Sequence, residues 1–257
     1  MRRTLERSGS LWVPSRREML GALGVGLLAP RMARAATFAL VDHCKTAIQN
    51  GIGSTNTIDS TGADLLICAI CTDQWGGANI QSDSKGNTWT LLRDQTCWWS
   101  GRIRLYYCIP TSVGSGHYLS IGGSYVGSVF FSGFSGALQT TPADQQNGNG
   151  TVTPNTATAL TTGAIAPAYP NELVVTACVS PDGDSTGISQ GILLDHLSNN
   201  IAYGGGFGYL IQTTATPVNL TWTQSVNSQM ATAIASFKST SSSVSSTAVR
   251  HRVIGGN

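Results

Sequence analysis

The chain has few charged residues, and nearly half of its basic residues lie at its beginning. Charged side chains make up 11% of the 257 residues. Seven of the fifteen Lys and Arg residues precede position 36, against two of the thirteen acidic residues. The remainder therefore has eight basic and eleven acidic residues, a formal charge of −3. Such a chain lacks the basic surplus that neutralises phosphates, which argues against nucleic-acid binding.

Glutamate is almost absent after residue 35, where Glu172 is the only one. A glycosidase typically places two carboxylates beside the scissile bond. Asp182 and Asp184 have a suitable spacing of two, but Pro181 and Gly187 flank them and predict a solvated turn. No G-x-S-x-G joins a strand to a helix, and no His or Cys spacing suits zinc. The sequence therefore predicts no catalytic residues and no cofactor, and favours a non-enzymatic protein. It assigns no metal site and leaves open only calcium binding through Asp73, Asp83, Asp182 or Asp184.

Long apolar runs are also lacking. The uncharged run at 19–29 is too short for the roughly 20 residues of a membrane span. It follows Ser15-Arg16-Arg17 and precedes Ala33-Arg34-Ala35, which is the order of a secretory signal. Paired arginines after a serine are typical of the twin-arginine (Tat) variant. We therefore expect residues 1–35 to be a signal peptide for the Tat export machinery, the rest to have no membrane segment, and the protein to be periplasmic or secreted.

Helical periodicity is almost absent after the signal, and short apolar or alternating runs recur between Gly, Pro, Asn and Ser residues. These runs predict strands at 38–43, 55–59, 64–71, 88–93, 103–109, 117–121 and 128–134 in the first half, and at 157–161, 172–179, 191–197, 202–212, 218–222 and 230–237 in the second. The segment between the halves, 140–155, is rich in Gly, Asn, Gln and Thr, and predicts a surface loop.

The two halves share a strand pattern that indicates a duplication. Residues 62–67 match 170–175, 89–94 match 191–196, 117–120 match 218–221, and 131–135 match 234–238. A half with roughly five strands cannot cover its own apolar face, whereas two halves packed face to face can. We therefore expect an all-β fold, a single jelly-roll-like antiparallel β-sandwich over residues 36–238. The Ser- and Thr-rich residues 239–257 are expected to be a linker and disordered tail.

Six cysteines follow the signal, at positions 44, 68, 71, 97, 108 and 178. An even number in an exported protein permits three disulfides. Cys97 and Cys108 flank an expected hairpin and are the first pair to test for a bridge. Cys68 and Cys71 lie on one expected strand, where residues i and i+3 face opposite sides. They are therefore expected to be buried small side chains rather than a metal or redox pair.

The order of motifs resembles a family of bacterial β-sandwich domains found in secreted and surface proteins. The matching pieces are 63–67, the segment Asp83-Ser84-Lys85-Gly86-Asn87-Thr88-Trp89-Thr90, and 105–107, followed by 131–134, 141–144 and 171–174. They span nearly all of residues 37–238, and they are strands and turns. The resemblance therefore implies a fold. It implies no catalytic residue, because the family has no established activity.

The aromatic residues are the candidates for binding. Trp98 and Trp99 precede an expected hairpin tip, and neighbours on a strand face opposite sides, so both cannot enter one core. The same holds for Tyr106 and Tyr107, and Trp75 lies in an expected loop. Exposed aromatic surface marks binding sites, and flat rings stack on sugars.

The predicted ligand-binding residues are therefore Trp75, Trp98, Trp99 and Tyr107. The predicted function is binding of polysaccharide, cell-surface glycans or other cell-surface components. Trp89 and Trp222 are expected in the core. The first alternative is a polysaccharide lyase or hydrolase on the same fold. The second is a purely structural envelope or appendage protein.

Overall fold

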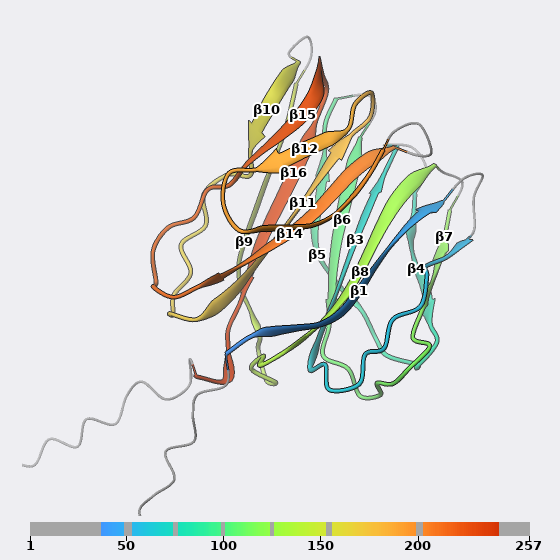
Figure 1. Ribbon diagram of the computed structural model, residues 1–257, viewed down its shortest axis with the longest axis vertical. Helices are drawn as coiled ribbons and strands as arrows, with labels where there is room; N and C mark the ends of the chain where they lie inside the picture. The colour runs from blue at the N-terminus through green and yellow to red at the C-terminus, as the bar shows by residue number, and fades with distance from the viewer. Residues whose placement is uncertain are drawn as a thin grey trace, which may run out of the picture. The chain divides into compact units, whose positions relative to one another are not determined.

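Antiparallel β-strands form the sheets of the part of this protein that the structure describes (Figure 1). The computed structural model describes residues 37–48, 53–73, 77–98, 101–123, 126–152, 156–198 and 203–241. Within these ranges no helix is long and apolar enough to cross a membrane. The predicted signal peptide at 1–35 and the tail from 242 onward lie outside the described residues.

The first half contributes a central sheet of five strands and an outer sheet of three. The central sheet has the order β1 (Ala39–Ile48), β8 (Gly127–Ser135), β3 (Leu65–Thr72), β6 (Arg102–Cys108) and β5 (Thr90–Thr96). The outer sheet has the order β2 (Gly53–Ser54), β7 (Leu119–Gly122) and β4 (Asn79–Asp83).

The second half has the same composition. Its central sheet has the order β9 (Ala143–Gly150), β16 (Ala231–Phe237), β11 (Glu172–Ser180), β14 (Gly204–Gln212) and β13 (Ile192–Leu197). Its outer sheet has the order β10 (Ala157–Thr161), β15 (Thr221–Ser228) and β12 (Ser185–Ile188). Each strand of the second half occupies the place of the strand eight earlier in the chain, so the predicted duplication is confirmed.

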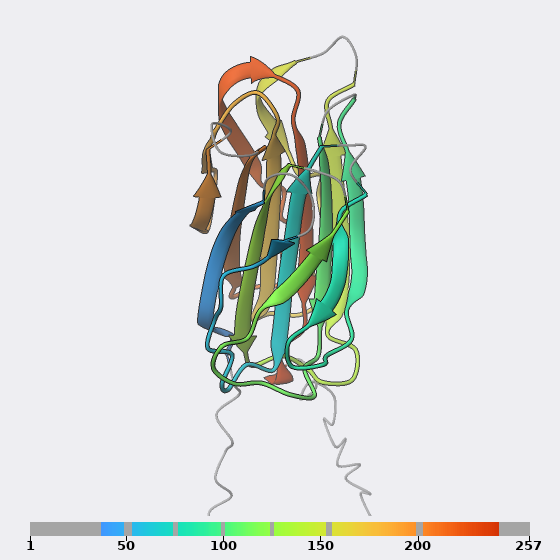
Figure 2. The ribbon, with the colours of Figure 1, turned by 90° about the vertical axis from the view of Figure 1, so that its right-hand side faces the viewer.

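The main core lies between the two central sheets, whose strands run in similar directions (Figure 2). Strand alternation sends Leu65, Ile67 and Phe130 from one sheet against Val175, Phe207 and Phe237 from the other. Cys71 lies in this core, whereas Cys68 faces the outer sheet, so their predicted opposite orientation is confirmed. The halves therefore pack face to face as expected, and the all-β fold is confirmed.

Each central sheet also buries its other face, against the three-stranded sheet of its own half. In the first half Leu66 and Phe131 contact Leu119 and Ile121. In the second half, side chains of the central sheet likewise pack against the outer sheet, where Trp222 is fully buried beside Cys178. Among the described residues each half therefore has eight strands, where the sequence pattern predicted seven in the first half and six in the second. Three of the strands that the sequence pattern did not predict, β2, β4 and β12, are short and largely polar, so they show no apolar alternation.

One expected loop is wrong, because part of the segment 140–155 forms the edge strand β9. Residues 143–150 read Ala-Asp-Gln-Gln-Asn-Gly-Asn-Gly, a composition poor in strand formers. β9 pairs with β16, and Asn147 and Asn149 donate side-chain hydrogen bonds to the carbonyls of Ala164 and Thr161. Tertiary pairing and amide side chains therefore hold a strand that intrinsic propensity disfavours.

The expected disulfides are also wrong, since all six cysteines are free and buried. Cys97 follows β5, and its N–H donates to Gly101 at one end of the β5–β6 hairpin. Cys108 ends β6 at the other end, next to the Thr90–Tyr107 pair. Their Cα atoms are about 25 Å apart, from the rise of a strand, whereas a disulfide requires less than about 7 Å.

We expect the native protein to react with a thiol reagent such as Ellman's reagent far more slowly than the unfolded protein. Burial raises the pKa of the Cys44 thiol to about 12, and that of Cys68 well above its usual value. The thiolate is the reactive form, so native thiols are inert until the fold opens. In denaturant without reductant all six thiols should react. A smaller number would contradict the free cysteines.

Candidate functional site

The predicted binding residues do not all come together. Trp75 and Trp99 lie outside the described residues. Trp98 is 46% exposed and follows β5 at one end of the β5–β6 hairpin, whereas Tyr107 pairs with Thr90 at the other end. Six residues of extended strand, about 20 Å, separate the Thr90 and Thr96 ends. Trp98 and Tyr107 therefore cannot contact one small ligand together.

Tyr107 lines a groove with a volume of about 500 Å³. Its walls come from β5, β6 and the segment that joins the two halves, and they comprise Thr88, Thr90, Tyr107, Cys108, Ile109, Gln139, Thr140, Thr141, Pro142 and Ala143. Four threonine hydroxyls and one amide side chain accompany the aromatic ring, and no lining residue carries a charge. This combination suits a neutral ligand that has both polar groups and an apolar face.

The connecting segment is held firmly against the end of the second half. The N–H of Leu138 donates to Lys238 O at 2.9 Å, and the N–H of Lys238 donates to Pro142 O at 2.7 Å. Gln139 adds hydrogen bonds from its amide nitrogen to the carbonyls of Asp64 and Ala137. The groove wall is therefore preformed, which lowers the ordering cost of binding.

The duplication supplies a natural comparison for Tyr107. Its ring packs on Phe237 of the other half with 5.6 Å between centroids, and Tyr209 packs on Phe134 in the equivalent way at 5.3 Å. Tyr107 is paired with Thr90, whereas Tyr209 is paired with Ile192. The two tyrosines thus share a structural role across the interface between the halves, and Tyr107 additionally lines the groove with its threonines.

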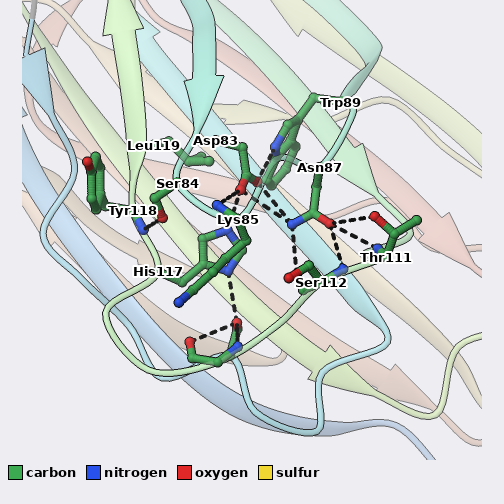
Figure 3. Close-up of polar contacts among 12 residues, drawn as sticks. Asp83, Ser84, Lys85, Asn87, Trp89, Thr111, Ser112, His117, Tyr118 and Leu119 are labelled. Atoms are coloured by element: carbon green, nitrogen blue, oxygen red, sulfur yellow. Dashed lines mark hydrogen bonds and ion pairs between the residues drawn. The ribbon is translucent and has the colours of Figure 1, made fainter.

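A buried hydrogen-bond network lies elsewhere in the first half, with Asp83 at its centre (Figure 3). Asp83 Oδ2 accepts from Trp89 Nε1 at 2.9 Å, and Oδ1 accepts from His117 Nε2 at 2.9 Å and from Lys85 N at 2.7 Å. Burial acts to raise the pKa of Asp83, but the hydrogen bonds from His117, Trp89 and Lys85 outweigh it and lower the pKa to about 2. The Asp83 carboxylate is therefore ionised, and both of its oxygens accept hydrogen bonds.

The same network contains a serine, a histidine and an aspartate in hydrogen-bond contact. Ser60 Oγ lies 2.8 Å from His117 Nδ1, and the other ring nitrogen bonds Asp83. Such a set is the machinery of serine hydrolases. Here Ser60 and His117 are both fully buried, and Ser60 Oγ also accepts from Gly114 N at 3.0 Å. No substrate carbonyl can reach Ser60, so the network is structural.

This network explains the Asp83–Thr90 motif noted in the sequence. Asp83 fixes the turn through Lys85 and Trp89, and Asn87 Oδ1 accepts from the N–H groups of Thr111 and Ser112. Trp89 then packs edge-on against Phe131, with centroids 5.9 Å apart. The sequence missed His117 as the partner of Asp83, because 34 residues separate them and nothing local links them.

Two further sets of side-chain contacts involve acidic residues of the edge strands β13 and β5. His43 Nδ1 is 2.7 Å from Asp195 Oδ2, which joins β1 of one half to β13 of the other. On the other edge, Arg102 and Arg104 both bond Asp94. Asp94 remains ionised, because hydrogen bonds and charge from the two arginines outweigh its burial and lower its pKa. Neither of these sets of contacts has the arrangement of a catalytic site.

Comparisons with known proteins add no identification. No family model, curated protein or solved structure matches this chain. The family resemblance described above therefore stays a prediction. Among the residues that the structure describes, no group of three or more His, Cys, Asp or Glu side chains is arranged to hold a metal ion.

Proposed function

We propose that this protein is an exported, non-enzymatic β-sandwich that binds neutral polysaccharide in the groove beside Tyr107. The observation that carries the proposal is the lining of that groove. It combines one aromatic ring with Thr88, Thr90, Thr140 and Thr141, and it has no charged side chain. Sugar rings present an apolar face for stacking and hydroxyls for hydrogen bonding, and the groove offers partners for both.

The groove also supports binding over catalysis. Hydrolysis of a glycosidic bond requires paired carboxylates near the bond, and the lining contains none. Asp64 lies next to the groove residue Gln139, but its carboxylate already accepts hydrogen bonds from the backbone N–H groups of Gly136 and Ala137. The twin-arginine signal predicted at 1–35 supports export, which would bring the groove to cell-surface or environmental glycans.

We expect Tyr107→Leu to weaken binding of a neutral glycan at least about tenfold, since an aromatic anchor in a partly enclosed site carries much of the binding energy. Thr90→Val should weaken it about threefold to tenfold, because it removes a hydroxyl and keeps the branched shape. A broad glycan array would identify the ligand, and calorimetry would measure the affinities of the folded variants.

Tyr209→Leu is the matched control, because it removes the equivalent contact between the halves outside the groove. It should destabilise the fold about as much as Tyr107→Leu and leave binding unchanged. An equal loss of binding in both variants would contradict the proposal that the groove beside Tyr107 is the binding site. If the folded protein binds no glycan, the result would favour the alternative of a purely structural envelope or appendage protein. Cleavage of a bound glycan would favour the lyase or hydrolase alternative.

A further inference from the structure

Glu172, the only glutamate after residue 35, is fully buried and half satisfied. It begins β11, and its Oε1 accepts from Tyr169 N at 3.0 Å. Its Oε2 has no hydrogen-bond partner among the described residues. Buried carboxylate oxygens are almost always paired, because an unpaired one loses its hydration without replacement. The free oxygen therefore indicates a missing partner.

Two neighbouring oxygen atoms are in the same condition. Gln212 lies directly opposite Glu172 on β14, and its Oε1 is buried and unpartnered within the described part of the chain. The Gln212 amide nitrogen is held by Thr216, which fixes the amide. Ser236 is fully buried, and its Oγ makes no hydrogen bond of normal length there. Its hydroxyl is near enough to Glu172 to lower the pKa of that carboxyl as a hydrogen-bond donor. Strand alternation places all three on one face of the central sheet.

A second carboxylate completes the group. Asp144 Oδ2 accepts from Ala168 N at 2.9 Å, next to the Tyr169 N–H that Glu172 accepts. Two carboxylates thus hold successive amides of one turn. Burial raises the pKa of Glu172 to about 7, and the nearby Asp144 charge adds to this, although hydrogen bonding to Ser236 and to the Tyr169 N–H acts in the opposite direction. Among the described residues no Lys, Arg or His forms a salt bridge with either carboxylate.

The equivalent place in the first half shows that this situation is not a requirement of the fold. Asp64 stands where Glu172 stands in the repeat. Its two oxygens accept from Gly136 N at 2.8 Å and Ala137 N at 2.9 Å. The first half therefore satisfies its carboxylate with its own backbone. In the second half, Glu172 Oε2 and Gln212 Oε1 have no hydrogen bond of normal length among the described residues.

We propose that Glu172, Asp144, Gln212 and Ser236 bind a calcium ion. The donors are oxygen atoms only, which hard cations prefer, and the two carboxylates supply the negative charge that a divalent ion neutralises. Asp144 is half-buried, so the group is accessible from its side. Two acidic ligands with neutral oxygens correspond to the weaker range of calcium sites, with dissociation constants of about 0.1–1 mM.

The test is calorimetric titration and thermal unfolding of the purified full chain, first stripped with a chelator. About 5 mM calcium chloride should raise Tm by about 3–8 °C. Magnesium should have a much smaller effect, because it requires tighter octahedral geometry. Glu172→Gln removes one charge but keeps the size and one oxygen, and should reduce the calcium shift below about 1 °C.

Asp64→Asn is the matched control, since it weakens the equivalent carboxylate of the first half. It should lower Tm but keep the calcium shift. Asp144→Asn should lose the shift as Glu172→Gln does, which gives a second test if one variant folds poorly. No heat and no Tm shift in the unmodified protein, an equal shift with magnesium, or an undiminished shift in Glu172→Gln would each overturn the proposal.

Discussion

Asp83→Ala should lower the free energy of unfolding by about 3–5 kcal/mol, the largest effect that we expect of a single substitution. The change leaves the Nε2–H of His117 and the Nε1–H of Trp89 buried without an acceptor, and it removes the bond that holds the turn at Lys85. The Asp83 side chain is 1% exposed, so water cannot replace these bonds without opening the structure. Urea denaturation monitored by tryptophan fluorescence would measure the loss.

Asp94→Ala is the control for this prediction. Asp94 bonds Arg102 and Arg104, but its side chain is 29% exposed, and exposed ion pairs contribute at most about 1 kcal/mol. Asp83→Asn should fall between the two, because its amide oxygen can still accept from one donor. A loss for Asp83→Ala no larger than that for Asp94→Ala would contradict the central role of Asp83.

Between about pH 5 and pH 8, the metal-free protein should become less stable as the pH rises. Burial and the charge of Asp144 raise the pKa of Glu172 to about 7, from an ordinary value of 4.5. The folded state therefore holds this proton more tightly than the unfolded state. Its contribution is complete below pH 4.5 and is lost as the pH passes through 7. The difference is at most about 3 kcal/mol.

Urea denaturation in chelator at several pH values would check this dependence. Glu172→Gln should flatten the curve over the same range, because glutamine does not titrate. Asp64→Asn should leave the slope intact, since Asp64 lies in the other half. An identical slope in Glu172→Gln and the unmodified protein would exclude Glu172 as the cause. Bound calcium should also flatten the curve, because a cation favours the ionised carboxylate.

Much of the fold could be predicted from local pattern. The central strands β3, β8, β11 and β16 are apolar runs bounded by turn residues, and a sheet buried on both faces requires such runs. The expected burial of Trp222 is confirmed, whereas Trp89 is only partly buried against the core. The repeat was also visible, because duplicated strands keep their buried side chains in the same order.

Local pattern failed where pairing alone makes a strand. β9 has Gln and Asn residues and two glycines, and it is a strand because β16 supplies its hydrogen bonds. The expected bridge between Cys97 and Cys108 failed for a related reason. The sequence places both cysteines near one hairpin but does not show at which end of it each one lies. The register of β5 with β6 places Cys97 and Cys108 at opposite ends.

The sequence by itself determined the fold class and the duplication, and it made Tyr107 a candidate binding residue. Strand alternation, turn residues and aromatic pairs are local properties, so a sequence shows them directly. Only the tertiary structure decided the groove and the buried networks. Asp83 meets His117 across 34 residues, and Glu172 meets Gln212 across β11 and β14. Chemical groups that act together are selected by distance in space, and the register of distant strands sets that distance.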